Sequence, residues 1–237
     1  MIREPFRFRE TIAIILADDP AHVAAAKNAM VEARQVIEGY IICDPFFKAT
    51  FDPYSPDSHE PVILRMCDAT RKAGVGPMAA VAGTIAWAGL EAMLESGAAF
   101  GVIDNGGDIA LMNDRPVNVG VHAGEATLSN RIAFVIPPQE KILGICTSSA
   151  TVGPSISFGI ADAVTIFSHD IALADAWATA VCNRIRPGDY SVLEEIDPEE
   201  VSGVFAVMGE TVVRWGDLPP LVNANVDERL ISAGDRL

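Results

Sequence analysis

Hydrophobic and polar positions in the first third of the chain predict a strand followed by two helices. Residues 11–16 form an apolar, β-branched run typical of a strand, which ends at Asp18-Asp19-Pro20. Apolar residues then recur at helical spacing from residue 20 to about 41, with Asp19 placed to cap that helix. Residues 43–59 are rich in proline and aromatic residues and predict a loop. A second helix is expected over residues 61–71.

The most apolar long stretch runs over residues 75–94. Gly76, Pro77 and Gly83 interrupt it, and alanine dominates its composition. We therefore expect a buried helix from Pro77 to about Glu95 rather than a membrane span.

The pattern then changes to short apolar runs separated by turn residues. These runs predict strands at residues 100–103, 109–112, 117–121, 132–136 and 143–147. Their close spacing favours antiparallel neighbours, because a parallel crossover needs a dozen or more residues. A further strand at 164–167, a helix at 171–184 capped by Ser168 or Asp170, and strands at 201–208 and 211–215 complete the pattern. The fold class expected is α+β, in a single domain over residues 1–237.

The composition of the chain limits the classes of molecule that the protein can be expected to bind. The chain has 237 residues, half of them hydrophobic, which is ample for a core without disulfides. Its four cysteines lack the short spacing of a zinc site, and residues 1–10 lack an apolar signal core, so we expect reduced thiols in a cytoplasmic protein. A formal net charge of −15 disfavours nucleic acid and anionic membranes. A phosphate-bearing ligand would need backbone N–H groups, local cations or a metal ion.

The first candidate motif is the turn from Asp104 to Asp108. Gly106 and Gly107 expose backbone N–H groups to close approach, while Asn105 and Asp108 add an amide and a carboxylate. The same residues are also typical of an ordinary β-hairpin turn with no ligand.

The second candidate is a run of small hydroxyl residues after a predicted strand. Thr147, Ser148 and Ser149 could bind an oxygen-rich ligand, and Ser148 could act as a nucleophile if a base lay near it. A solvated loop explains the run equally well.

The third candidate lies on the helix over residues 171–184. Asp175 and Thr179 are four residues apart, so both project from one helix face, where a carboxylate and a hydroxyl can share Mg²⁺. The alternative is a helix that merely packs by its alanine face.

The fourth candidate is the Gly-x-Gly-Pro turn around Gly76, which precedes a helix N-terminus and could bind an anion. Tight packing through small residues is the alternative there.

Together, Asn105-Gly106-Gly107-Asp108 and the later segment over residues 174–180 resemble the motifs of ApbE-type flavin transferases. Those enzymes move FMN from FAD onto a protein threonine with Mg²⁺. The chain is more similar, over nearly its whole length, to an uncharacterised branch of that superfamily. The resemblance implies an ApbE-like, T-fold-related α+β architecture, with antiparallel sheets covered by helices. It also places Asp175 and Thr179 on the metal side and puts the turn at 105–108 beside the flavin. T-fold-related sheets often associate, so the resemblance also implies a homodimer.

Two departures from the transferase pattern concern its charged groups. Residues 74–83 lack the lysine that the transferases carry in the comparable segment. The transferases also have a histidine four residues before a Pro-x-Thr-Gly motif. When Pro154 is aligned with that proline, Ala150 takes the histidine position and Ser155 to Ser157 stand where the Thr-Gly should fall.

Three hypotheses remain. The chain is an Mg²⁺-dependent flavin or nucleotide transferase, a non-catalytic binding or assembly protein that kept the fold, or a hydrolase that uses Ser148.

Overall fold

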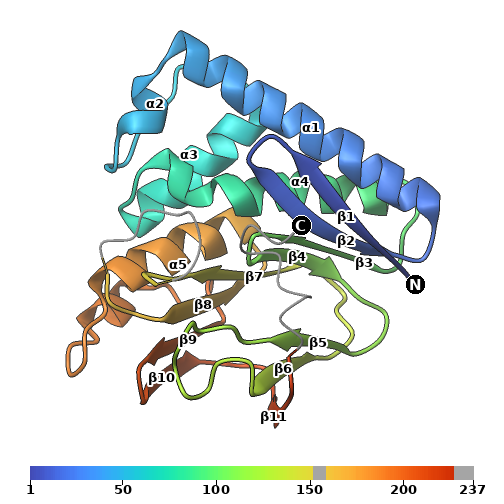
Figure 1. Ribbon diagram of the computed structural model, residues 1–237. Coiled ribbons are helices and arrows are strands. Elements are labelled where there is room, and N and C mark those ends of the chain that lie inside the picture. The colour runs from blue at the N-terminus through green and yellow to red at the C-terminus, as the bar shows by residue number, and fades with distance from the viewer. Residues whose placement is uncertain (152–158, 227–237) are drawn as a thin grey trace.

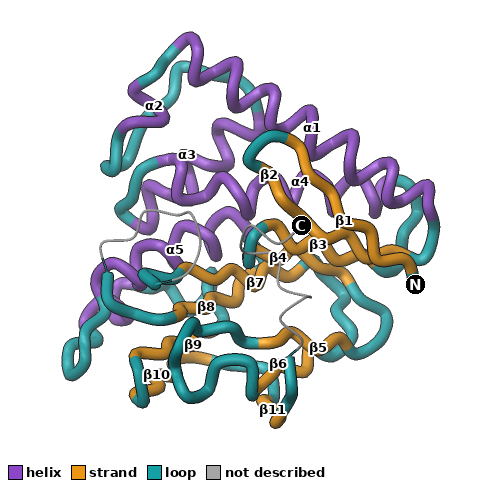
Figure 2. Tube along the Cα trace, viewed as in Figure 1, coloured by secondary structure: helices purple, strands orange, loops and turns teal. Residues whose placement is uncertain are grey.

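The chain folds into three layers, which Figure 1 shows from the side. The computed structural model describes residues 1–151 and 159–226. Helices form the first layer, an eight-stranded sheet the second, and a three-stranded sheet the third. Figure 2 shows the same division, with the helices on one side of the strands.

Every strand in the larger sheet is antiparallel to its neighbours. The order is β1-β2-β3-β4-β7-β8-β9-β10. The bounds are β1 Ile2–Phe8, β2 Thr11–Ala17, β3 Gly101–Asn105, β4 Asp108–Met112, β7 Leu143–Ser148, β8 Ala163–Ser168, β9 Gly203–Met208 and β10 Thr211–Gly216. The smaller sheet has the order β11-β6-β5, with β5 Val117–Gly120, β6 Ile132–Ile136 and β11 Leu221–Asn223. The observed architecture confirms the α+β class and the antiparallel pairing expected from the short strand spacing.

The helical layer is built around one central helix. Its members are α1 Pro20–Cys43, α2 Phe46–Ala49, α3 Pro61–Ala73, α4 Val81–Glu95 and α5 Ile171–Arg184, with the short 3₁₀ helices η1 Pro77–Ala80 and η2 Ser191–Glu195. Helix α4 contacts α1 on one side and β3 and β4 on the other. Asp19 caps α1 by accepting from the N–H of Ala21 at 2.7 Å, and Asp170 caps α5 by accepting from the N–H of Leu173 at 2.9 Å.

Two separate cores follow from the period-two alternation of the central strands. Ile103, Ala110 and Cys146 face the helices and join the larger core. Val102 and Leu111, from the same strands, face the smaller sheet and pack with a second, phenylalanine-rich core. In that second core Phe134 makes edge-to-face contacts with Phe167 and Phe205.

Helix α4, with η1, forms the stretch Pro77–Glu95, which is apolar and long enough to cross a membrane by composition. Half of its most apolar window is buried inside the protein. Ile85, Ala86 and Leu90 are essentially inaccessible to solvent. The expectation of a buried helix is therefore confirmed for this segment.

Four described elements, β1, α2, η2 and β11, were not expected from the sequence. Strand β1 lies at residues for which the sequence indicated only the lack of an apolar signal core, although Ile2, Phe6 and Phe8 alternate with exposed Arg3, Pro5 and Arg7. Pro5 is tolerated because β1 is an edge strand. Helix α2 and strand β11 are very short, and their apolar residues carry no readable period.

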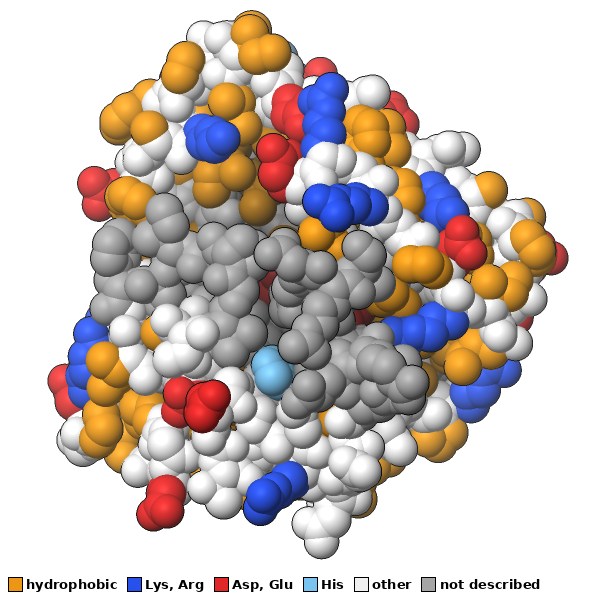
Figure 3. Space-filling view, viewed as in Figure 1, with side chains coloured by type: hydrophobic (Ala, Val, Ile, Leu, Met, Phe, Trp, Pro, Cys, Tyr) orange, Lys and Arg blue, Asp and Glu red, His pale blue; other side chains and the backbone are white. Residues whose placement is uncertain are grey.

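Large apolar side chains remain exposed where α1 meets α2. Ile42 is 80% exposed, and Phe46 and Phe51 are each 61% exposed. On the face drawn in Figure 3, hydrophobic side chains gather over this end of the molecule.

Candidate functional site

The turn between β3 and β4 is a two-residue hairpin. Asn105 pairs with Asp108 across the strands, and the two central residues have left-handed backbones, with φ +70° at Gly106 and +102° at Gly107. Only glycine adopts both conformations without strain. Asp104 closes the turn by accepting a hydrogen bond at 2.9 Å from the N–H of Gly107. The hairpin interpretation is thus confirmed, and it still leaves open what the flanking side chains do.

Those flanking side chains point into the helical layer rather than into water. Asn105 is 5% exposed and Asp108 is 9% exposed. The side-chain amide of Asn105 donates to the carbonyl of Ala82, in the first turn of α4, at 2.9 Å. The hairpin therefore holds the start of α4 by a buried hydrogen bond.

Asp175 on α5 holds the same turn from the other side. Its Oδ2 atom accepts from the N–H of Gly83 at 2.8 Å, and the residue is 8% exposed. A Cβ on Gly83 would lie 2.9 Å from the Cβ of Asp175 and 3.0 Å from the carbonyl oxygen of Ile171. Glycine is needed there for α4 and α5 to approach this closely. The carboxylate of Asp175 fills the anion position at the N-terminus of α4.

Asp108 and Asp175 form a buried acidic pair. Burial, followed by the charges of Asp175 and Asp104, raises the pKa of Asp108 well above its ordinary value. Burial raises the pKa of Asp175 to about 7, although hydrogen bonds from the backbone at Gly83 and Ala82 oppose the shift. Hydrogen bonds from Cys146 and from the backbone at Thr147 reach the carboxyl group of Asp108 and oppose the rise in its pKa. Its Oδ1 atom, however, is buried and has no hydrogen-bond partner among the described residues. Such an orphaned acceptor is costly, and a cation would satisfy it.

Cys146 lies on the strand beside this pair. It is the cross-strand partner of Asp108, and its Sγ lies 3.6 Å from the carbonyl oxygen of Ile171. Burial and the neighbouring carboxylates Asp108 and Asp175 raise the pKa of the Cys146 thiol. The thiol is thus a neutral neighbour of the acidic pair rather than a reactive nucleophile.

The acidic pair alone does not make a complete metal site. Within residues 1–151 and 159–226, no three His, Cys, Asp or Glu side chains are grouped as metal ligands. Mg²⁺ commonly binds proteins through one or two carboxylates and takes its remaining ligands from water and substrate phosphates. Asp108 and Asp175 fit that partial donor set, and a ligand would have to supply further oxygens.

The hydroxyl run at the end of β7 divides between the two faces of the sheet. Thr147 bonds its hydroxyl to that of Thr165 at 2.9 Å, on the face away from Asp108, and its N–H donates to the carbonyl of Gly107 at 3.2 Å. Ser148 is two residues beyond Cys146, on the same side as Asp108. Ser149 accepts from the N–H of Thr151 at 3.0 Å. Among the side chains of this run, only that of Ser148 is brought to the acidic pair's side by strand alternation.

Two further residues predicted to line the site are Thr179 and Gly76. Thr179 is partly exposed on α5, one turn beyond Asp175. Gly76 is tightly packed, since a Cβ there would lie 2.1 Å from the carbonyl oxygen of Thr50. Packing therefore explains Gly76, as the alternative interpretation held. Pro154 and the segment from Ser155 to Ser157 lie outside the described residues.

The nucleophile hypothesis for Ser148 gains no base from the structure. His122 bonds Asn130 at 3.0 Å, and His169 bonds the carbonyl of Ile142 at 2.7 Å. In the described part of the chain no hydrogen bond joins Ser148 to a histidine.

Comparison with known proteins connects this geometry to a family. The family model described as "AbpE bacteria" matches residues 6–201. The chain is 68% identical over its full length, and that of its relative, to a UPF0280 protein from Methanoregula boonei. It is 62% identical to one from Methanoculleus marisnigri, over 99% of this chain and 96% of that protein.

The chain belongs to the UPF0280 family. Two solved structures share its fold. The first is the apo form of the Pseudomonas stutzeri flavinyl transferase ApbE, which has a TM-score of 0.57 and 12% identity, with 98% of each chain covered. The second is the flavin transferase ApbE from Vibrio cholerae, which has a TM-score of 0.55 and 11% identity, with 90% of this chain and 96% of that chain covered. The expected ApbE-like architecture of the UPF0280 chain is therefore confirmed.

Sequence reasoning missed part of this site. It selected Asn105, Asp108 and Asp175, but not the N–H of Gly83 or the carbonyl of Ala82 that join them. The signal available was Gly83, one of two glycines inside an alanine-rich helix, because a glycine there costs helix stability unless close packing requires it.

Proposed function

We propose that this UPF0280 protein binds a flavin nucleotide, FAD or FMN, through Mg²⁺ held against Asp108 and Asp175. One observation carries the proposal, which is that the buried Oδ1 of Asp108 has no hydrogen-bond partner among the described residues and lies beside a second buried carboxylate. Two buried carboxylates repel one another and repel phosphate, so a divalent cation is the group that reconciles them with a phosphate-bearing ligand.

Each neighbouring residue has a role in this proposal. Asn105 and Asp175 fix the start of α4, so the two carboxylates are held before any ligand arrives. Asp108 would ligate the cation directly, and Asp175 would share it through the carboxylate oxygen that does not accept from Gly83. Thr179, one turn along α5, is placed to add a hydroxyl ligand. Ser148 and the backbone of Gly106 would contact the oxygens of the flavin nucleotide, whereas the N–H of Gly107 already donates to Asp104 and Gly107 would only allow close approach.

The net charge supports the same assignment. With a formal charge of −15, the chain as a whole repels a pyrophosphate group. The N-terminus of α4, which could otherwise attract an anion, is already occupied by Asp175. A bound cation removes this conflict, and it makes nucleotide binding dependent on Mg²⁺.

The test is a titration of FAD into purified protein, followed by flavin fluorescence and by calorimetry, with Mg²⁺ or with EDTA. We expect binding with Mg²⁺ and at least about tenfold weaker binding with EDTA. The control variant Glu210→Gln removes one negative charge in the exposed turn between β9 and β10, and it should bind FAD like the unchanged chain. Equal affinity with Mg²⁺ and with EDTA would disprove the metal-mediated site.

The proposed flavin binding could serve FMN transfer or could occur without transfer, and binding without transfer is the second candidate function. The observation that favours it is the sequence of residues 74–83 and position 150, which lack the lysine and histidine of the transferase pattern. Incubation with FAD, Mg²⁺ and a threonine-containing acceptor protein, followed by intact mass measurement, separates the two. A mass gain of one FMN on the acceptor supports transfer, and bound FAD with no mass gain supports a binding protein.

A further inference from the structure

A groove on the outer side of the helical layer is separate from the acidic pair. It lies between α1, α3 and α4 and has a volume of about 220 Å³. Ala29, Ala33 and Ala88 leave room along its floor because their side chains end at Cβ. Small-molecule sites usually enclose about 300–1,000 Å³, so this groove suits one long side chain better than a nucleotide.

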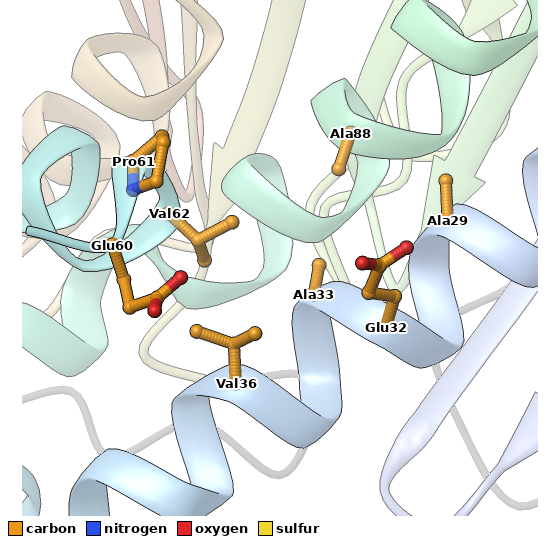
Figure 4. Close-up of a pocket in the computed structure, with 8 residues that line it drawn as sticks. All are labelled: Ala29, Glu32, Ala33, Val36, Glu60, Pro61, Val62 and Ala88. Atoms are coloured by element: carbon orange, nitrogen blue, oxygen red, sulfur yellow. The ribbon is translucent and has the colours of Figure 1, made fainter.

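Two carboxylates flank this apolar space. Figure 4 shows Glu32 of α1 and Glu60, just before α3, on opposite sides of the groove, with Val36 and Val62 between them. Both glutamates are exposed. Neither carboxylate forms a hydrogen bond or an ion pair with any residue that the structure describes. This differs from nearby Arg65, which pairs with Glu91 at 3.0 Å and stacks on Trp87.

The chemistry of the groove matches a cation on an aliphatic stem. The apolar floor and walls suit methylene groups, and the two carboxylates suit a charged head that remains near water. Arginine fits better than lysine, since its planar guanidinium is weakly hydrated and has five donors for two separate carboxylates.

We propose that this groove docks an arginine side chain, flanked by apolar residues, from a partner protein. The proposal is independent of flavin binding. Gly83, at the acidic pair, and Ala88, at the groove, are five positions apart in the sequence, which places them about 7–8 Å apart along the α4 axis and on different sides of it. A partner docked here would lie across α4 from the proposed flavin site.

The test uses side-chain probes and methyl NMR signals of Val36 and Val62. We expect saturable shifts with n-butylguanidinium, and about two- to fivefold weaker binding of its neutral isostere n-butylurea. The peptide Ala-Leu-Arg-Leu-Ala, acetylated and amidated, should bind more tightly than butylguanidinium because its leucines add apolar contact. The same peptide with citrulline in place of arginine should bind as weakly as butylurea.

Matched variants decide whether the glutamates are responsible. Glu32→Gln and Glu60→Gln should each remove the preference for the charged probe, whereas Glu210→Gln should keep it. Ala29→Leu should block all probes by filling the floor while leaving both carboxylates in place. Circular dichroism and thermal melting confirm folding of each variant.

Four outcomes would overturn the proposal. They are no saturable shift, equal binding of butylguanidinium and butylurea, equal binding of butylguanidinium and the arginine peptide, and a dimer in light scattering that Glu32→Gln dissociates. The third outcome would indicate a site for a free cation, and the fourth would make a second copy of the chain the occupant.

Discussion

The carboxyl group of Asp175 has two opposing effects on the folded chain. Its hydrogen bond to Gly83 ties α5 to α4, while its burial penalises the charged form. Because the folded pKa of about 7 lies above the ordinary value of 3.8, the folded state binds the proton more tightly than the unfolded state. Stability therefore falls as pH rises from about 4 to about 7. Above that range, the contribution of Asp175 protonation to the stability of the folded state is completely lost.

Asp175→Asn should remove this pH dependence. Asparagine keeps an oxygen that accepts from Gly83 and carries no charge. In buffer with EDTA, we expect the variant to gain stability over the unchanged chain by up to about 1.4 kcal/mol for each pH unit across that window. Urea unfolding at pH 5 and at pH 8 measures the gain. A difference that stays constant between the two pH values would contradict the assignment.

Gly83→Ala should destabilise the protein even though alanine favours helices. The added Cβ would lie too close to Asp175 and to the carbonyl oxygen of Ile171. Overpacking of this kind costs about 1–3 kcal/mol. Gly39→Ala, in α1, meets nothing within 4 Å and should stabilise the chain by about 0.5–1 kcal/mol. Thermal melting of the two variants decides the point, and a stabilised Gly83→Ala would refute the close approach.

At the scale of elements, the sequence predicted most helices and strands because their apolar periods are unambiguous. It did not predict β1, because arginine and proline on the exposed face hid the period of Ile2, Phe6 and Phe8. It also placed Thr147 and Ser148 together at the ligand. The pairing of Thr147 with Thr165 shows that neighbouring residues of a strand face opposite sides of the sheet.

The contacts at the start of α4 could not be predicted for a different reason. Asn105, Gly83 and Asp175 are far apart in the sequence, and their meeting depends on how α5 and the β3–β4 hairpin pack on α4. Each motif alone also fits a structural role, as the hairpin and the packed Gly76 show. Only their convergence at one helix end makes a shared site the better interpretation.

Asn105→Ala should therefore act on this element rather than on the hairpin. Loss of the side-chain amide leaves the carbonyl of Ala82 without this buried donor, which costs about 1–3 kcal/mol. Hydrogen exchange should show faster exchange in the first turn of α4 and unchanged protection in the β3–β4 ladder. Faster exchange in the ladder alone would contradict this role of Asn105.

For the molecule as a whole, the four cysteines differ in how far they are buried. Cys43 is exposed, while Cys67, Cys146 and Cys182 are buried, and burial raises the pKa of Cys67 to about 11. We expect a thiol-specific disulfide reagent at pH 8 to modify Cys43 alone in the native chain and all four after denaturation in guanidinium. Peptide mass mapping identifies the modified residue, and native labelling of Cys146 would show that the acidic pair is open to reagents.

The whole-molecule predictions of a single domain, a cytoplasmic location and a homodimer remain predictions. Light scattering on the purified protein tests the homodimer, and the exposed apolar residues Ile42, Phe46 and Phe51 give a surface where such a contact could form. A mass that stays at 25.2 kDa across concentration would contradict it.

The central claim is that a divalent cation joins Asp108 to the phosphates of a flavin nucleotide. Mn²⁺ can replace Mg²⁺ at oxygen ligands and is paramagnetic. Electron–nuclear double resonance of the protein with Mn²⁺ and FAD therefore tests the claim directly. We predict a ³¹P coupling from phosphate bound to Mn²⁺ in the unchanged chain, and its loss in Asp108→Asn. A ³¹P coupling that survives in Asp108→Asn, or bound FAD without any such coupling, would contradict the account.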